Sequence, residues 1–142
     1  MQTSIDLAAL VAAAADAIVV ADPDGRVLLW NAGAERLFGF SEAEMLGQSL
    51  DPIIPERFRA RHWDGYHATM RTGHTRHAGA LLQVPATHKD GRRLSIAFTV
   101  ALLTDATGAV TAIGAILRDD TARWQTERDL RSRLAALEPA PG

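Results

Sequence analysis

The clearest hydrophobic pattern in the chain is an alternation between residues 94 and 102. Apolar side chains stand at every second position (Leu94, Ile96, Phe98, Val100 and Leu102), and Ser, Ala, Thr and Ala stand between them. Because successive side chains of a strand point to opposite faces, this segment predicts a strand with one apolar face. The small residues on the other face suit a surface that another element covers.

Turn signals separate this strand from two others. Lys89-Asp90-Gly91 is typical of a hairpin turn, and residues 105–108 form a second turn signal. Residues 80–87 and 110–117 are therefore predicted strands, although Pro85 favours an edge position or a bulge for the first of them. Three consecutive strands joined by short turns make a meander.

The first half of the chain alternates between helix and strand signals. Asp22-Pro-Asp-Gly25 is a strong turn sequence between two apolar runs, so it predicts an antiparallel hairpin. Ser41-Glu-Ala-Glu44 is a capping box. The predicted elements are a helix over 4–15 capped by Ser4 or Asp6, strands over 17–21 and 26–30, a helix over 32–37 capped by Asn31, and a short helix from 41 to about 47.

Residues 55–71 predict one longer helix. Proline is tolerated in a first helical turn, and Gly73 provides a usual stop. Apolar or aromatic residues at helical spacing form a stripe that should face the core: Phe58, His62, Tyr66 and Met70. A core-facing histidine is either a hydrogen-bonded core residue or a ligand to something bound inside.

A charged helix is predicted over 122–137, with Thr121 as its cap. Leu130, Leu134 and Leu137 repeat at coiled-coil spacing, which favours a homodimer over the alternative that the helix folds back on its own sheet. We therefore expect an N-terminal cap helix in 1–15, one domain in 16–121, and a C-terminal signalling helix with its tail in 122–142. Helices on one side of an antiparallel sheet make this an α+β domain.

Composition excludes several classes of function. The 142 residues carry a formal net charge of −2 and no cysteine. This net charge does not favour binding to nucleic acid. No apolar run approaches the roughly 20 residues that span a bilayer. The absence of cysteine excludes disulfides and thiolate chemistry. The five histidines do not form a zinc pattern. We expect a cytoplasmic protein without a membrane segment, and without a catalytic acid–base pair we do not expect an enzyme.

With these elements in place, the sequence resembles the PAS sensor family. The resemblance rests on five motifs: Asp16 to Gly25, Trp30 to Gly39, Glu44 to Gly47, Lys89-Asp-Gly91 and Arg118-Asp-Asp-Thr121. It implies a five-stranded antiparallel sheet with short helices and one longer helix on one face. Asp120 departs from the family, which usually has an apolar residue there.

Within that family, Pro55-Glu-Arg-Phe-Arg-Ala-Arg-His62 is similar to the haem-binding oxygen sensors of nitrogen-fixation kinases and of a bacterial phosphodiesterase. The resemblance implies haem b, with His62 as the ligand of its iron. Other candidates for contact with the haem are Tyr66 on the same helix, Phe98 and Val100 on the facing strand, Leu82, His77 as a substitute donor or second axial ligand, and Arg76 as a partner of the propionates, with His67, Arg71 and His74 near it.

The distal side departs from the oxygen sensors. The position of their distal arginine is Leu82 here, and the position of the phosphodiesterase's distal methionine is Ala80. Without a donor to offset the charge on bound dioxygen, an apolar pocket favours CO or NO over O₂ as the diatomic gas.

Two other hypotheses remain open. The chain fits a cofactor-free PAS domain that dimerises or binds a small ligand, in which His62 is a structural residue. A haem with an open apolar distal side could also show weak peroxidase-like chemistry. Trp63 and Trp124 are candidates for interface residues.

Overall fold

The fold is built on one five-stranded antiparallel sheet, with strands in the order β2-β1-β5-β4-β3. The computed structural model describes residues 4–75 and 79–137. The strands are β1 (Ala17–Ala21), β2 (Val27–Trp30), β3 (Leu82–Thr87), β4 (Arg93–Thr104) and β5 (Val110–Asp119). The predicted α+β class, hairpin and meander are confirmed.

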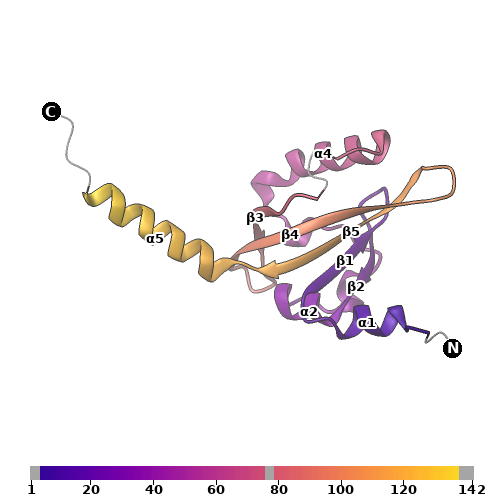
Figure 1. The fold of residues 1–142 in the computed structure, drawn as a ribbon, viewed down its shortest axis with the longest axis horizontal. Coiled ribbons are helices and arrows are strands. Elements are labelled where there is room, and N and C mark those ends of the chain that lie inside the picture. Colours follow the sequence, from indigo (N-terminus) through magenta and orange to yellow (C-terminus); the bar gives the residue numbers. More distant parts are fainter. Residues whose placement is uncertain (1–3, 76–78, 138–142) are drawn as a thin grey trace.

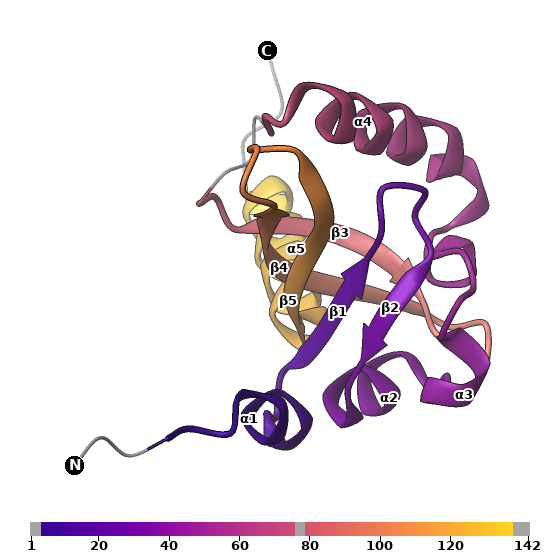
Figure 2. The same cartoon turned by 90° about the vertical axis from the view of Figure 1, so that its right-hand side faces the viewer.

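Helices stand at both ends of the β1–β2 hairpin. The helical elements of the described residues are α1 (Leu7–Ala13), α2 (Ala32–Phe38), α3 (Glu42–Met45), the 3₁₀ turns η1 (Asp51–Ile53) and η2 (Glu56–Phe58), α4 (Arg59–Thr72) and α5 (Thr121–Leu137). Figure 1 shows α5 leaving the body of the domain at the end of β5. Figure 2 shows α4 near the turn of the β1–β2 hairpin, with α2 and α3 at the hairpin's other end. In the described part of the chain, no helix is long and apolar enough to cross a membrane.

The tightly packed core lies at the α2 and α3 end of the sheet. Its largest fully buried side chains are Trp30, Phe38, Met45 and Val27. The Trp30 indole N–H donates to the carbonyl of Phe40 at 2.9 Å, so its one polar group is satisfied. We expected the sheet and the stripe of the longer helix to enclose the core between them, and the space between them also holds a pocket.

In the first half of the chain, the sequence predicted the capping residues of the helices correctly. Asn31 caps α2, and Ser41 with Glu44 forms the capping box of α3. Asp6, the second of the two candidates, caps α1, which is shorter than predicted. Gly73 ends α4 with a φ of 71°.

The longer helix begins later than the sequence predicted. Pro55 has extended backbone geometry (φ −54°, ψ 136°), and the one-turn 3₁₀ segment η2 separates it from α4 at Arg59. The Arg59 Nε–H donates to the carbonyl of Ile54 at 3.0 Å, which holds this junction. Proline therefore precedes the turn instead of standing in the first turn of the helix.

The small-residue face of β4 is covered only at one end. Ser95 and Ala97 are buried, whereas Thr99 and Ala101 are exposed. The Ser95 N–H donates to Thr121 Oγ1 at 3.0 Å, and the Asp120 N–H donates to the Ser95 carbonyl at 2.7 Å. The start of α5 thus covers the first half of this face, and the second half is open in a single chain.

Candidate functional site

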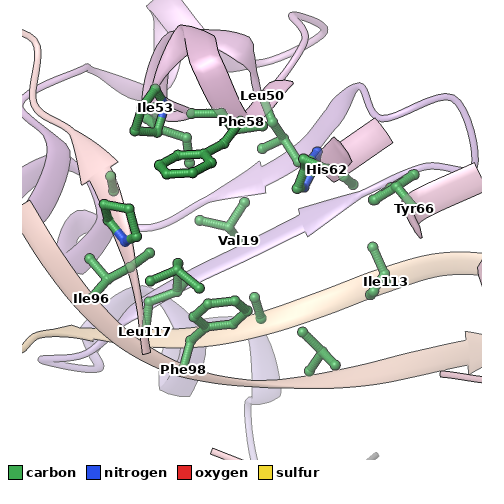
Figure 3. A pocket seen from close by; sticks show the side chains of 18 of the residues that line it. Val19, Leu50, Ile53, Phe58, His62, Tyr66, Ile96, Phe98, Ile113 and Leu117 are labelled. Atoms are coloured by element: carbon green, nitrogen blue, oxygen red, sulfur yellow. The ribbon is translucent and has the colours of Figure 1, made fainter. Parts of the chain in front are cut away.

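A largely apolar pocket of about 480 Å³ lies between α4 and the inner face of the sheet (Figure 3). This volume is within the range of small-molecule and cofactor sites. The residues that line it are Val19, Ala21, Leu50, Ile53, Ile54, Pro55, Phe58, Arg61, His62, Tyr66, Val84, Pro85, Ala86, Ile96, Phe98, Val100, Ile113, Ala115 and Leu117.

One wall comes from η2 and α4. Phe58, His62 and Tyr66 are spaced by four residues, so they share one side of this segment, and all three line the pocket. Met70, the fourth residue of the predicted stripe, is not among the lining residues. Figure 3 shows Phe58 and His62 across the pocket from Phe98. The periodicity in the sequence thus predicted three of the four positions on this wall.

His62 is the most unusual lining residue. Its Nδ1 atom is buried and finds no hydrogen-bond partner in the part of the chain that the structure describes. Burial lowers the pKa of the His62 imidazole, and nearby Asp51 opposes this effect only in part. The ring is therefore neutral at neutral pH, which is the form that binds a metal.

The α4 wall is fixed to the rest of the domain by the two aromatic neighbours of His62. The Trp63 indole N–H donates to Asp51 Oδ1 at 2.7 Å, and the Tyr66 hydroxyl donates to the Asp22 carbonyl at 2.5 Å. Burial raises the pKa of the Tyr66 phenol, which is therefore protonated and able to donate at neutral pH. The His62 ring lies 4.6 Å from that of Trp63, centroid to centroid, in an edge-on arrangement.

Trp63 also packs on the β1–β2 turn. A Cβ atom on Gly25 would lie 2.2 Å from the Trp63 ring, and Gly25 has a φ of +83°. Our expectation of an interface role for Trp63 gains no support from this position, because its ring is partly buried within its own domain. The glycine of the Asp22–Gly25 turn is the sequence signal that could have suggested a close approach at this point.

The opposite wall comes from β4 and β5, and it is apolar throughout. Phe98 and Val100 lie on it as predicted, together with Ile113. Leu82 lies on β3 opposite Phe98 but outside the lining residues. Arg76 and His77 lie outside the described residues, so their predicted roles stay predictions.

Arg61 is the cationic side chain among the lining residues, and helical spacing in the sequence did not predict its place there. It has no ion pair within the described residues. The candidates for propionate contacts on α4 and just after it, His67, Arg71 and His74, are exposed and do not line the pocket. The sequence also did not predict Leu50, Ile53 and Ile54 at the pocket, although Ile53 and Ile54 form an apolar pair immediately before Pro55.

The site fits a haem-type cofactor better than an ion held by protein groups alone. Within residues 4–75 and 79–137, no three His, Asp or Glu side chains come together as metal ligands. A porphyrin itself supplies four nitrogen ligands to the iron. The protein therefore needs to supply only one or two further ligands and an apolar cavity. An unpartnered, neutral histidine on the wall of an apolar pocket meets both requirements.

Comparison with known proteins agrees with the fold. The PAS fold family model matches residues 5–119, so the chain belongs to the PAS family. It is 32% identical over 123 residues to the Sensor protein FixL of Bradyrhizobium diazoefficiens, covering 86% of this chain and 24% of that protein. It is 24% identical over 120 residues to the Oxygen sensor protein DosP of Escherichia coli, covering 84% of this chain and 15% of that protein. The chain thus spans less than a quarter of the length of these two relatives.

Among solved structures, the chain is similar to that of an RNA-binding Light-Oxygen-Voltage receptor. The TM-score is 0.77 at 25% sequence identity, over 92% of this chain and 36% of the other. PAS domains of one fold therefore occur in proteins that respond to different signals, and the function of this chain has to be argued from its own pocket.

Proposed function

We propose that this PAS domain binds haem b in the pocket beneath α4, where His62 would hold the iron, and that it senses a diatomic gas or a change of redox state. The observation that carries the proposal is the buried Nδ1 of His62, which has no partner among the described residues and stands in an apolar pocket. The similarity to two proteins named as sensors, one of them an oxygen sensor, supports it.

The residues of the chain have distinct roles in this proposal. His62 holds the iron, and Phe98 and Val100 form the apolar surface on the other side of the pocket, with Tyr66 beside His62. Haem supplies an iron atom that binds O₂, CO or NO. Because no donor lines the β4–β5 wall, the pocket favours CO or NO over stably bound O₂.

The test is to express the protein with a haem supply and to record its absorbance. The native protein should purify with a Soret band, and His62→Ala should lose the band or shift it. His67→Ala is the matched control, because His67 is an exposed histidine on the same helix and should leave the spectrum unchanged. A native protein without a Soret band after haem reconstitution would contradict the proposal, and an unchanged His62→Ala spectrum would remove His62 as the ligand.

We also propose that the domain dimerises through α5 and signals through this helix. Leu130, Leu134 and Leu137 lie on one side of α5 and are 52%, 64% and 81% exposed, which leaves a leucine stripe without cover in a single chain. Light scattering at micromolar concentration should give a dimer for the native protein. Leu130→Lys with Leu134→Lys should give a monomer, and Ser132→Lys on the opposite side of the helix should not. A native monomer would contradict this proposal.

A further inference from the structure

A second, more polar hollow adjoins the pocket. It is an open groove between η2 and the β3–β4 turn, and Pro55, Pro85 and Ala86 line both the groove and the pocket. Glu56 and Arg57 belong to η2, and Arg93 is the first residue of β4. An apolar cavity and a charged groove therefore meet at the proline pair.

The two arginines of the groove have no carboxylate partner within the described residues. The Arg57 guanidinium lies 4.7 Å from the centroid of the Phe58 ring, and the Arg93 guanidinium lies 5.2 Å from that of Trp124. Glu56 shares the groove but forms no ion pair with either of them. Both guanidinium groups thus rest on aromatic faces and keep their hydrogen-bond donors available for an oxyanion.

We propose that the pocket and the groove together bind one amphipathic carboxylate, with the apolar body in the pocket and the carboxylate at Arg57 and Arg93. The proposal rests on the proposed function in taking the pocket as a ligand site, but it does not require haem. Haem, with its two propionates, is one member of this ligand class, and a long-chain fatty acid is another. The family resemblance implies a propionate contact at Arg76, which follows the other end of α4 in the sequence, with Arg71 as a further candidate, so the groove is a different anchor.

The position of Arg93 connects this anchor to α5. Trp124 lies in the first turn of α5, and Arg93 and Arg128 both approach its ring. A carboxylate bound to Arg93 places a negative charge beside the contact between Arg93 and Trp124. Ligand binding would in this way change the surroundings of Trp124 at the base of the helix.

The test compares pairs of ligands that differ only in the carboxylate. Calorimetry would measure the affinity of the purified protein for dodecanoate and dodecanol, and absorbance would measure its affinity for haem and haem dimethyl ester. The variant Arg57→Gln/Arg93→Gln should bind the acids roughly tenfold or more weakly, since a charge-assisted pair is lost, and should bind the alcohol and the ester as before. Arg71→Gln, an exposed arginine at the other end of α4, should change none of the four affinities.

Trp124 gives a second readout. In protein labelled with 5-fluorotryptophan, the resonance assigned to Trp124 by its absence in Trp124→Phe should shift with dodecanoate and not with dodecanol.

Each result that differs from these expectations has its own meaning. An equal loss for acid and alcohol would reduce the arginines to a structural role, and a selective loss in Arg71→Gln would place the carboxylate at the other end of α4. A native protein that does not prefer the acid of either pair, or binds none of the four ligands, would overturn the proposal. If only haem and its ester fail to bind, the haem proposal fails and the dodecanoate pair still decides the anchor.

Discussion

The Tyr66 hydroxyl donates a hydrogen bond of 2.5 Å to the backbone carbonyl of Asp22, across 44 residues of sequence. This contact joins the middle of α4 to the β1–β2 turn, and His62 stands one helical turn before it. The wall that carries the candidate ligand is therefore held in place by the β1–β2 turn.

Loss of this hydrogen bond should lower the stability of the domain and leave the pocket in place. Tyr66→Phe keeps the ring but leaves the Asp22 carbonyl without its donor, so we expect a loss of about 1 kcal/mol in the free energy of unfolding. Urea unfolding measures it. Thr69→Val, on the same helix, is the control, and an unchanged midpoint in Tyr66→Phe would show that the bond contributes nothing.

Gly25→Ala should be costlier than its backbone geometry alone explains. Gly25 and Gly47 have similar φ angles of +83° and +77°, but a Cβ on Gly25 meets the Trp63 ring at 2.2 Å, and a Cβ on Gly47 meets nothing within 4 Å. Both substitutions should cost about 1 kcal/mol or more through backbone strain, with Gly25→Ala the larger.

A double-mutant cycle separates the two contributions. In a Trp63→Ala background the extra cost of Gly25→Ala should disappear, because the ring that its Cβ meets is gone. If Gly25→Ala and Gly47→Ala cost the same in the native background, the close packing of Trp63 on the turn is wrong.

His62 should make stability depend on pH in the absence of a ligand. Its pKa in the folded state lies below its ordinary value of 6.5, so the unfolded chain binds the proton more tightly. Stability from this group is complete above pH 6.5 and is lost as the pH falls from 6.5 through the lowered pKa. Thermal unfolding of the haem-free protein at pH 7.5 and 5.0 should therefore show a larger drop for the native protein than for His62→Leu. An equal drop in both would contradict the burial of this imidazole, and His74→Ala should behave as the native protein.

The missing distal donor can be supplied from β3. Leu82 pairs with Phe98, which lines the pocket. Because directly paired residues place their side chains on the same face of a sheet, an arginine at position 82 would stand on the face that carries the apolar wall. We expect Leu82→Arg to slow autoxidation of the O₂ complex several-fold, with Leu82→Met as the size control. Autoxidation followed by absorbance measures this, and an unchanged rate in Leu82→Arg would place the bound gas away from β3.

The sequence predicted the elements well because their signals are local. The alternation over 94–102, the turn at Asp22–Gly25 and the capping box at Ser41 each depend on neighbouring residues, and the structure confirms all three. The start of α4 was predicted too early because a proline suits a first helical turn as well as the residue before a 3₁₀ turn, and only the geometry of η2 distinguishes the two.

The sequence predicted pocket residues only where a periodic pattern applies, which is on part of each wall. Phe58, His62 and Tyr66 follow from helical spacing, and Phe98 and Val100 follow from strand alternation. Arg57 and Arg93 line one groove because the fold places η2 across from the β3–β4 turn, and no short-range pattern encodes that arrangement. The packing of Trp63 on Gly25 is likewise a long-range relationship that only the fold supplies.

The central claim is that His62 ligates haem iron, and rescue by free imidazole tests it most directly. His62→Gly should bind haem weakly or with an altered Soret band, and millimolar imidazole should restore the spectrum of the native protein, because the ligand re-enters the space that the side chain left. The same titration of His67→Gly should follow that of the native protein, and its spectrum before imidazole is added should already equal the native one. A His62→Gly protein whose spectrum already equals that of the native protein before imidazole is added would contradict the claim.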